Sequence, residues 1–559
     1  MIIGLDVGGT HTDIVLLGSE GLERSIKVPT DTGDLFHTVL TGLEQITEGV
    51  TPDQIHRLVL STTLTTNAIV QNRVPPVGMI VSGGPGIDPE FHRTCEHYYV
   101  VSGSIDHRGR EIDGIRPEEI EAASRSFREA GISHVGVVGK FSIRNPAHEL
   151  GIREILGNDF EKVFLGHRIS GNLNFPRRIA TTYLNTAVYS IHKPFFEAVR
   201  KSLDQKGLSV PIRILKADGG NMNLDASIDF PAQTILSGPA ASVMGSLAFA
   251  PEEEDALVLD IGGTTTDMAL LVNGAPLLDP LGIVMGKHQT LIRSLETQSI
   301  GIGGDSVVQV ADGRIIIGPE RLGPAMAYGG PAPTPTDAMF VMGMIHAEGR
   351  EKAEAGLQPL ADALNLSMEK TAAKIFDTAC HAILDEAGRM IERINAKPVY
   401  TVHEMLEGHK VTPKKLLILG GPALYFANRL EEISAFKVGV VPRWAVANAI
   451  GAALARTTCE VTLFADTEQG TATAPEENFR ASVEKNFAVP DAVDMAFGLL
   501  RTKAIGCGAN PDHLEMEVVE QMTFNMVRGF HTTGKNIRVK TQVKPGMIHG
   551  YDPVAGKLT

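Results

Sequence analysis

The sequence is poor in cysteine, has no excess of basic residues and contains no long apolar run. Its four cysteines, Cys95, Cys380, Cys459 and Cys507, are far apart and form neither a C-x-x-C pair nor a metal-ligand spacing, which predicts incidental free thiols in a reducing compartment. The net charge of −15 argues against a general nucleic-acid or anionic-membrane binder. No apolar run reaches about 20 residues, and the chain opens on a strand-like MIIGLDV rather than on a signal peptide. We therefore expect a cytoplasmic protein with no nucleic-acid or membrane partner.

Glycine, by contrast, is abundant. The 559 residues include 58 glycines, which indicates many tight turns and close backbone approaches. Hydrophobic residues make up 43% and charged residues 21% of the chain, as in a globular protein. The length is sufficient for two large lobes and a small additional domain.

One glycine- and threonine-rich element occurs twice. LDVGGTHTD occupies residues 5–13 and LDIGGTTTD occupies residues 259–267, with seven of the nine positions identical. Each copy reads as strand, tight turn and strand, followed by another turn, which predicts a β-hairpin. A dinucleotide-binding turn or a P-loop would open a helix instead, and the sequence contains no G-x-x-x-x-G-K-[ST] motif. A single copy would be typical of a plain hairpin, but the spaced duplication favours a functional pair.

The residue types in this element suit a phosphate group. In such a turn the backbone N–H groups of Gly8 and Gly9 are open to an oxyanion, and Thr10 and Thr12 add hydroxyl donors. Asp6 would repel a phosphate unless a divalent cation lies between them, and Mg²⁺ takes oxygen ligands of this kind. The second copy repeats the pattern with Asp260, Gly262, Gly263, Thr264 and Asp267. Two facing hairpins would hold a polyphosphate from two sides.

Two such hairpins on two related lobes resemble the fold shared by actin, sugar kinases and chaperone ATPases. LLILGGPALYFANRL (416–430) is similar to the adenosine motif of that fold. ILSGPAASVMGSLAFA (235–250) and WAVANAIGAALA (444–455) are similar to its two connecting helices, whose small residues permit close helix packing. The resemblance predicts an α/β protein with a two-lobed actin-like ATPase fold built from duplicated ribonuclease-H-like lobes.

A narrower resemblance is to the A subunit of the hydantoinase/oxoprolinase family. The matching stretches follow the family's order over about residues 1–458. They are DVGGTHTD, STTLTTNAIVQNR (61–73), FSIRNPAHELGIREIL (141–156), RRIATTYLNTAV (177–188), LSGPAASVMG (236–245), LDIGGTTTDMAL (259–270), SIGIGGDSV (299–307) and GPERLGPAMAYGGPAPTPTDA (318–338).

This resemblance implies an ATP-dependent enzyme or enzyme subunit that uses Mg²⁺. The family includes enzymes that open cyclic amides, such as 5-oxoproline and hydantoins, and subunits of ATP-dependent ketone carboxylases. The resemblance also implies a small-molecule substrate, cyclic amide or ketone-like, a B-type partner subunit and an oligomer. We expect an ATP-dependent cyclic amide hydrolase of the hydantoinase/oxoprolinase type. The alternatives are a ketone carboxylase subunit and an ATP-gated regulatory or activator module.

In this interpretation the chain has three parts. Residues 1–205 form lobe I, with an insertion over about 76–175, and residues 206–462 form lobe II. Residues 463–559 form a small α+β appendage that contains a helix over 490–506. Family members commonly carry a longer C-terminal domain, so the appendage leaves open how a partner subunit would dock.

The predicted nucleotide site combines both hairpins with two further glycine pairs. The predicted Mg²⁺ ligands are Asp6 and Asp260. The predicted catalytic residues are Asp6, Asp260, Asp267, Thr10 and Thr264. The predicted ATP-binding residues are Gly8, Gly9, Thr10, Thr12, Gly262, Gly263, Thr264, Gly303 and Gly304 for the phosphates, and Gly420 and Gly421 for the adenosine.

Five further residues are candidates for substrate binding, each with a structural alternative. Thr62, Thr63 and Asn67 either line a polar site or cap and flank a helix. Arg178 either binds an anionic substrate group or forms a surface or interlobe ion pair. Asp337 either contacts phosphate or substrate, or caps a helix.

Several positions depart from the patterns that the chain resembles. Chaperone ATPases carry a glutamate near the attacking water at the head of the first connecting helix, where this chain has Ser237. Serine cannot act as that base, so we expect slow ATP hydrolysis and a substrate oxygen as the attacking group. Within the narrower family, Gln298 replaces a common histidine, Asp305 a glycine and Met326 a cysteine. Asp305 either caps a helix or belongs to the active site, and these changes predict a different substrate if the usual residues touch it.

Overall fold

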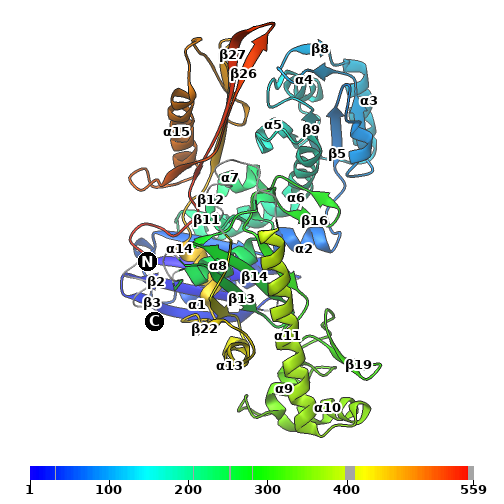
Figure 1. Cartoon of the computed structure of the whole chain (residues 1–559), viewed down its shortest axis with the longest axis vertical. Coiled ribbons are helices and arrows are strands. Elements are labelled where there is room, and N and C mark those ends of the chain that lie inside the picture. Colours follow the sequence, from blue (N-terminus) through cyan, green and yellow to red (C-terminus); the bar gives the residue numbers. More distant parts are fainter. Residues whose placement is uncertain are drawn as a thin grey trace.

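The computed structural model describes residues 1–9, 11–31, 33–205, 207–247, 249–250, 254–279, 281–396 and 410–551. These residues form two α/β lobes, a smaller sheet inserted in the first lobe and a C-terminal sheet (Figure 1). None of the helices in these ranges has the length and apolar character needed to cross a membrane. The predicted fold class, a duplicated ribonuclease-H-like core of the actin-like type, is confirmed by the strand order of the two lobes.

The first lobe contains a six-stranded sheet that begins with the first hairpin. Its strands are β1 (Ile2–Val7), β2 (His11–Gly18), β3 (Gly21–Pro29), β4 (Arg57–Thr62), β11 (Ile212–Leu215) and β12 (Asn221–Asn223). Their order is β12-β11-β4-β1-β2-β3, with β1, β4 and β11 parallel and the others antiparallel to their neighbours. Helices α1 (Leu35–Ile46) and α6 (Phe175–Gln205) contribute apolar residues to the core beneath this sheet.

This sheet extends past the predicted lobe boundary at residue 205. β11 and β12 follow that boundary in the chain, yet β11 pairs with β4 of the first sheet. Two parallel strands need a long crossover, and α6 completes the crossover from β4 to β11. Only then does helix α8 (Ser237–Leu247) lead the chain to the second lobe. The division into 1–205 and 206–462 is therefore corrected: the first lobe continues to the start of α8.

The second lobe repeats this arrangement. Its strands are β13 (Ala256–Ile261), β14 (Thr266–Val272), β15 (Ala275–Pro276), β21 (Lys415–Leu419) and β22 (Lys437–Val440). Their order is β15-β14-β13-β21-β22, and β18 (Thr297–Ile300) also pairs with β14. In both sheets a hairpin supplies the central strand, and parallel strands are added on its other side. The repeated sequence element is therefore the first hairpin of each lobe.

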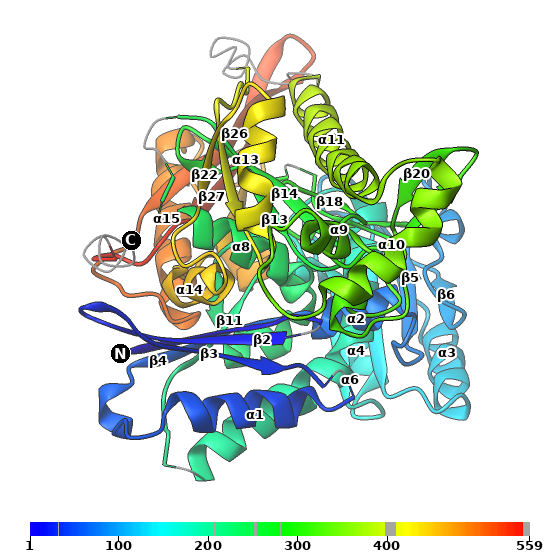
Figure 2. The ribbon, with the colours of Figure 1, turned by 90° about the horizontal axis from the view of Figure 1, so that it is seen from below.

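Two helices of small residues, α8 and α14 (Ala447–Leu454), lie between the two sheets (Figure 2). Their backbones touch: a Cβ atom on Gly451 would lie 2.3 Å from the carbonyl oxygen of Ala241. A Cβ atom on Gly245 would lie 2.2 Å from the carbonyl oxygen of Ala447. The close approach predicted for the connecting helices is thus observed.

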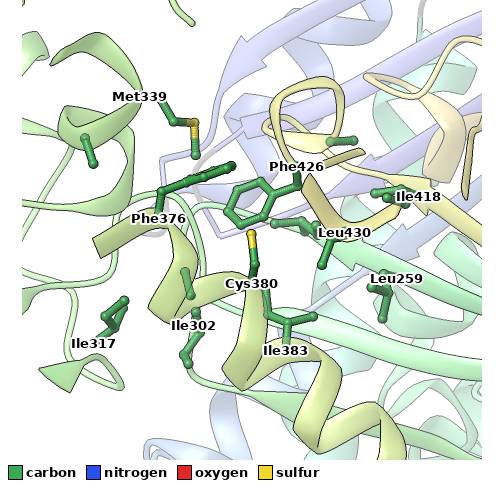
Figure 3. Packing of buried hydrophobic residues seen from close by; sticks show 14 of the residues in the cluster. Leu259, Ile302, Ile317, Met339, Phe376, Cys380, Ile383, Ile418, Phe426 and Leu430 are labelled. Atoms are coloured by element: carbon green, nitrogen blue, oxygen red, sulfur yellow. The ribbon is translucent and has the colours of Figure 1, made fainter. Parts of the chain in front are cut away.

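The apolar core of the second lobe lies where α11 (Met368–Asn395) and α13 (Ala423–Ile433) pack on the second sheet (Figure 3). Phe376 of α11 and Phe426 of α13 have ring centroids 4.9 Å apart. Cys380 is a buried free thiol in this cluster, and Cys95, Cys459 and Cys507 are also free, as predicted. Helices α9 (Pro335–Val341) and α10 (Arg350–Leu364) add to the same core.

The insertion in the first lobe is a four-stranded parallel sheet covered by helices. Its strand order is β10-β9-β5-β6. The elements are β5 (Gly78–Ser82), β6 (Tyr98–Val101), α3 (Pro117–Glu129), β9 (His134–Gly139), α4 (Ala147–Leu156), β10 (Lys162–Leu165) and α5 (Gly166–Ile169). The short helices α2 (Leu64–Val70) and α7 (Leu224–Asp229) flank α6. Three short antiparallel pairs are β7 (Ser104–Ile105) with β8 (Glu111–Asp113), β16 (Val284–Met285) with β17 (His288–Gln289), and β19 (Val308–Ala311) with β20 (Arg314–Ile317).

The C-terminal sheet begins at Glu460 and is antiparallel throughout. Its order is β25-β24-β23-β27-β26, and helix α15 (Val489–Gly506) packs on β23 and β27. The strands are β23 (Glu460–Asp466), β24 (Thr471–Ala474), β25 (Phe479–Ser482), β26 (Met516–Arg528) and β27 (His531–Val543). The backbone N–H of Asn223 donates to the carbonyl oxygen of Cys507 at 3.0 Å, which ties this sheet to the first lobe.

Candidate nucleotide site

The turns of the two hairpins have the same internal hydrogen bond. The Gly8 N–H donates to the carbonyl oxygen of His11 at 3.1 Å, and the Gly262 N–H donates to that of Thr265 at 2.9 Å. These two amides, predicted to bind phosphate, are therefore used inside the turns. Gly9 stands at an open tip, where an added Cβ would meet no atom within 4 Å. The predicted residue Thr10 lies outside the described residues.

Gly303 and Gly304 were predicted to bind phosphate through free backbone amides. In the structure these amides donate hydrogen bonds that support the second turn. The Gly304 N–H donates to the carbonyl oxygen of Gly262 at 2.9 Å, and the Asp305 N–H donates to that of Gly263 at 2.6 Å. The Gly303 N–H donates to Ser306 Oγ at 2.9 Å. These amides are satisfied within the protein, so their predicted role in binding phosphate directly is corrected to one of bracing the turn.

The threonines of the two hairpins differ in burial and in hydrogen bonding. Thr12 is fully buried, and its hydroxyl shares a 2.9 Å hydrogen bond with the hydroxyl of Thr30. Thr264 is half-buried, and its carbonyl oxygen accepts a hydrogen bond from Ser306 Oγ at 3.2 Å. Of these two predicted phosphate contacts, Thr264 is the more accessible.

Four carboxylates gather where the hairpins meet. In the first hairpin Asp6 lies opposite Asp13, and in the second Asp260 lies opposite Asp267. Burial is the main cause that raises the pKa of Asp6, Asp13 and Asp267, and the charge of Asp260 adds to it in each case. This contribution places the two hairpins within electrostatic reach of each other. The structure therefore brings together the predicted Asp6, Asp260 and Asp267. It adds Asp13, which the repeat itself marks as the counterpart of Asp267.

The two connecting helices hold Asp260. Ser242 Oγ of α8 donates to Asp260 Oδ2 at 2.6 Å, and Asn448 Nδ2 of α14 donates to the same oxygen at 3.1 Å. Asn448 also lowers the pKa of Asp6, so this one side chain lies between the two aspartates. Neither Ser242 nor Asn448 was identified from the sequence, because polar residues among the small residues of a helix carry no distinctive signal.

Asp6 has the properties expected of a cation ligand. Burial raises its pKa to about 6, and the charges of Asp13 and Asp260 act in the same direction. Its Oδ1 atom is buried and has no hydrogen-bond partner among the residues that the structure describes, which is costly for a carboxylate oxygen. A divalent cation would satisfy this atom. In the described part of the chain no group of three or more acidic, His or Cys side chains is arranged to hold a metal, so water would complete the coordination.

We expect Asp6→Asn to stabilise the metal-free protein at neutral and higher pH. The pKa of Asp6 is raised from 3.8 to about 6, so the folded state holds a proton that the unfolded state has lost. Wild-type stability is therefore lost as the pH rises through this window, by up to about 3 kcal/mol. Asparagine has no charge to bury and avoids this loss. Melting temperatures in EDTA between about pH 4 and about pH 8 test it. Parallel pH curves for the two proteins would contradict it.

The glycine pair of the predicted adenosine motif follows β21. Gly420 has φ 95°, and a Cβ there would lie 2.5 Å from Asp260 Oδ1 and 2.3 Å from the carbonyl oxygen of Ile261. Gly420 is therefore required for close approach to Asp260. At Gly421 an added Cβ would meet no atom within 4 Å, so this residue is the open member of the pair.

An ion pair stands beside the second turn. Arg321 Nη2 lies 3.3 Å from Asp305 Oδ2, and a Cβ on Gly263 would lie 2.8 Å from the same carboxylate oxygen. Arg321 Nε is buried, and no described residue accepts a hydrogen bond from it. Asp305 thus lies beside the second turn and begins no helix, so the capping alternative is not met, and its place in the active site stays a prediction. Arg321 was missed, because its stretch is rich in Gly and Pro and reads only as an ordered loop.

Three of the predicted substrate residues lie next to the first hairpin. The hydroxyl of Thr63 donates to the carbonyl oxygen of Val7 at 3.3 Å, and Asn67 Nδ2 donates to Thr63 Oγ1 at 3.1 Å. Thr62 is buried, and its hydroxyl accepts from the Leu64 N–H at 3.1 Å at the start of α2. Thr63 is the N-cap residue of α2 but makes no capping hydrogen bond with its side chain, which bonds to the end of β1 instead. The group therefore flanks the start of α2 at the end of β1.

The other two predicted substrate residues have structural roles. Arg178 is fully buried and donates to the carbonyl oxygens of Gly139 and Lys140 at 2.6 and 2.7 Å. Asp337 is fully buried at the start of α9, where it accepts from the Thr334 and Ala327 N–H groups at 2.9 and 2.7 Å. Both carboxylate oxygens of Asp337 accept hydrogen bonds, whereas Nε of Arg178 has no hydrogen-bond partner among the described residues. The full burial of both side chains favours structural roles over contact with a substrate.

Ser237 occupies the head of α8, as the motif predicts. It is buried, and its hydroxyl donates to the carbonyl oxygen of Thr62 at 3.1 Å. This hydrogen bond ties the start of α8 to the end of β4 in the first lobe. The position therefore supplies no carboxylate beside the two hairpins.

The two lobes have the same strand order and are joined by two close helices, and their acidic hairpins meet at Asn448. This arrangement defines the two-lobed actin-like fold. The chain belongs to the hydantoinase/oxoprolinase family. It matches that family over residues 178–461 and the family's N-terminal region over residues 2–160.

Comparison with known proteins agrees with this assignment. The α subunit of caprolactamase from Pseudomonas jessenii is 24% identical over 489 residues, which cover 79% of this chain and 68% of that protein. A crystal structure of ATP-dependent caprolactamase from P. jessenii matches with a TM-score of 0.69 at 18% identity, over 98% of this chain and 88% of that one. A nucleotide-free structure of acetone carboxylase, from work on ATP-dependent acetone carboxylation, matches with a TM-score of 0.70 at 17% identity, over 99% and 88%. The family thus includes ATP-dependent enzymes, some of them built from several kinds of subunit.

Proposed function

We propose that this chain is the ATP-dependent subunit of a cyclic amide hydrolase. The observation that carries the proposal is the meeting of Asp6 and Asp260 at Asn448, with buried or partly buried carboxylates from both lobes. Such a concentration of negative charge is costly without a cation, and Mg²⁺ bound to nucleotide phosphates would offset it. Asp6 and Asp260 would hold the Mg²⁺, and the tips at Gly9 and Gly263, with Thr264, would face the phosphates.

The proposed chemistry activates an amide carbonyl. The amide oxygen of the substrate attacks the γ-phosphorus of ATP, the bond from that phosphorus to the bridging oxygen breaks, and ADP leaves. Water then adds to the activated carbonyl carbon and the C–N bond of the ring breaks, which leaves an acyl phosphate and the free amine of the opened ring. A second water hydrolyses the acyl phosphate, so that inorganic phosphate and the ring-opened amino acid are released. Bound Mg²⁺ would neutralise charge on the phosphates during transfer. Asp6 and Asp260 would fix the cation, and Arg321 would add positive charge beside the second turn.

The absence of a carboxylate at Ser237 supports a substrate oxygen as the attacking group. Ser237 Oγ is engaged with the carbonyl oxygen of Thr62 and has no acidic character. Water therefore lacks a general base at this position, whereas an amide oxygen needs none. ATP turnover without a substrate is accordingly expected to be slow.

The test is ADP formation by the purified chain with ATP, Mg²⁺ and a panel of lactams, hydantoins and 5-oxoproline. The panel is run with and without a B-type subunit from the same source, which we propose as the partner. Under the proposal at least one cyclic amide raises ADP formation by about tenfold or more over ATP alone, the scale of general catalytic effects. No stimulation by any cyclic amide with the partner present would overturn it.

The same assay separates the two alternative functions. Stimulation by a ketone only when bicarbonate is present would identify a carboxylase subunit, as in the acetone carboxylase that shares this fold. Tight nucleotide binding with no turnover under any condition would identify an ATP-gated regulatory module.

A further inference from the structure

A cavity of about 80 Å³ lies where the two lobes and the C-terminal sheet meet. Its walls come from α5 and α6, the connection between β11 and β12, the segment 291–293, and β23 with α15. In Figure 1 the C-terminal sheet and α15 stand beside β11 and β12. None of the residues that line the cavity belongs to either acidic hairpin, so the cavity is separate from the candidate nucleotide site.

The lining combines charges of both signs with apolar surface. Four cationic side chains and three anionic ones line it, namely Arg168, Lys216, Arg293 and Lys503, and Asp218, Glu460 and Glu476. Some of these are paired within the protein: Lys216 lies 3.1 Å from Asp218, and Lys503 lies 2.5 Å from Glu477. Met222, Phe230 and Ile292 contribute apolar wall. The lining residues alone carry one more cationic than anionic side chain, with Glu477 beside Lys503 and Lys540 beside Glu460 just outside the lining.

Arg293 lacks hydrogen-bond acceptors. Its Nε lies 3.5 Å from Asp218 Oδ2 and its Nη1 lies 3.8 Å from Glu460 Oε2, so its charge is compensated at a distance. All three of its guanidinium nitrogens are buried, and none of them donates a hydrogen bond to any residue that the structure describes. A guanidinium offers five N–H donors in a planar fork that suits a carboxylate. Buried donors without acceptors are costly, and an anionic ligand would supply the acceptors that Arg293 lacks.

Glu476 presents the opposite requirement. Its side chain is buried, with the residue 9% exposed, and its Oε1 accepts a hydrogen bond from the Gly171 N–H. Its Oε2 is buried and has no hydrogen-bond partner within the described ranges of the chain. Burial raises the pKa of Glu476 to about 7, as expected for a carboxyl with too few donors around it. An N–H or O–H donor on a ligand would satisfy Glu476 Oε2.

We propose that this cavity binds a small carboxylate that also carries an N–H donor, with the carboxylate on Arg293 and the donor on Glu476. The two unpartnered groups line one cavity, so one molecule can satisfy both. A carboxylate would neutralise the excess cation of the lining. A site of this volume has room for about five to eight water-sized groups. The ligand is therefore a molecule of that number of heavy atoms.

Two isosteric probes test both halves of the proposal. N-acetylglycine carries a carboxylate and an amide N–H, and 4-oxopentanoate has a methylene in place of that N–H. N-methylacetamide has the N–H and no carboxylate. Isothermal titration calorimetry is performed on the full chain without ATP. We expect N-acetylglycine to bind about tenfold more tightly than 4-oxopentanoate, which is the size of effect typical for one hydrogen bond to a charged group. N-methylacetamide, which lacks the carboxylate, is expected to bind more weakly than either.

Variants assign the contacts. Arg293→Gln is expected to weaken the binding of both carboxylates by about tenfold, and Glu476→Gln to reduce the preference for N-acetylglycine. Arg389→Gln, on the exposed side of α11, is the matched control and leaves binding unchanged. Equal affinities for the two carboxylates, no binding at millimolar concentration, or binding unaffected by either variant would overturn the proposal. If Arg293→Gln does not fold, the probe pair and Glu476→Gln still decide. The calorimetry contains no ATP, so a negative binding result would not contradict the proposed function. A negative result in the ATP turnover assay would likewise not contradict this binding site.

Discussion

Asp260→Asn is expected to lower substrate-stimulated ATP turnover by at least about a hundredfold, the usual effect of removing one preorganised charge from a reaction centre. Asp260 is the carboxylate at which the two lobes and both connecting helices converge, through Ser242 and Asn448. Its charge also acts on Asp6, Asp13 and Asp267. Asparagine keeps the shape and one oxygen, so the fold is retained while the negative charge that would hold Mg²⁺ is lost. ADP release measures the rate, and magnesium titration of the rate shows whether the cation is involved.

A matched substitution distinguishes this effect from a general loss of charge. Asp312→Asn changes an exposed aspartate in the β19–β20 turn, where φ is 50° and asparagine is well tolerated. Turnover in that variant is expected to equal wild type. Ser242→Ala removes one hydrogen bond to Asp260 and is expected to cost less than Asp260→Asn. Unchanged turnover and unchanged magnesium dependence in Asp260→Asn would refute the assignment of Asp260 to the site.

The sequence predicts the two halves of the site because each is encoded by a local repeat. Strand, Gly-Gly-Thr turn and strand follow one another within nine residues, and the register that sets Asp6 opposite Asp13 follows from the turn itself. The same register gives Asp13 the position that Asp267 has in the second hairpin. Asp13 could therefore have been included from the duplication alone.

The hydrogen bonding of the turn amides was less predictable from the sequence, because it depends on how the turns are closed. A Gly-Gly turn offers two amides in sequence, but Gly8 and Gly262 use theirs to close the hairpins. Gly303 and Gly304 resemble the start of a helix in sequence, yet their amides satisfy the second turn and Ser306. Contacts between residues far apart in the sequence determine which backbone amide stays free to bind a ligand. The spacing of residues within the motif does not indicate these contacts.

Residues brought in from distant segments could not be predicted at all. Asn448 reaches Asp260 across 188 positions of the chain, and only the crossing of α8 and α14 places it there. Arg178 shows the reverse case. An arginine in a family motif suggests an anion site, but its guanidinium is fully buried against the carbonyl oxygens of Gly139 and Lys140. Burial and partner geometry are tertiary properties, which is why both kinds of residue required the structure.

The second prediction concerns the contact between the lobes: Gly451→Ala is expected to destabilise the protein by about 3 kcal/mol or more, beyond the usual cost of overpacking by one methyl group. The added Cβ would lie 2.2 Å from the backbone nitrogen of Gly245 and 2.3 Å from the carbonyl oxygen of Ala241. Backbone atoms of a packed helix cannot turn away as a side chain does, so α8 and α14 must separate. The apparent melting temperature is the measurement.

The matched control makes the same chemical change in another helix. Gly388 lies within α11, and a Cβ there would meet no atom within 4 Å. Because alanine is the better helix former, Gly388→Ala should be neutral or stabilising by up to about 1 kcal/mol. If Gly451→Ala lowers the stability while Gly388→Ala raises it, the loss is caused by the contact between the helices and not by the replacement of glycine as such. Since Ser242 of α8 and Asn448 of α14 both hold Asp260, a separation of these helices should also lower ATP turnover at temperatures where Gly451→Ala is still folded. A Gly451→Ala protein with wild-type melting temperature and wild-type turnover would show that the helices tolerate separation and that the position of Asp260 does not depend on their contact.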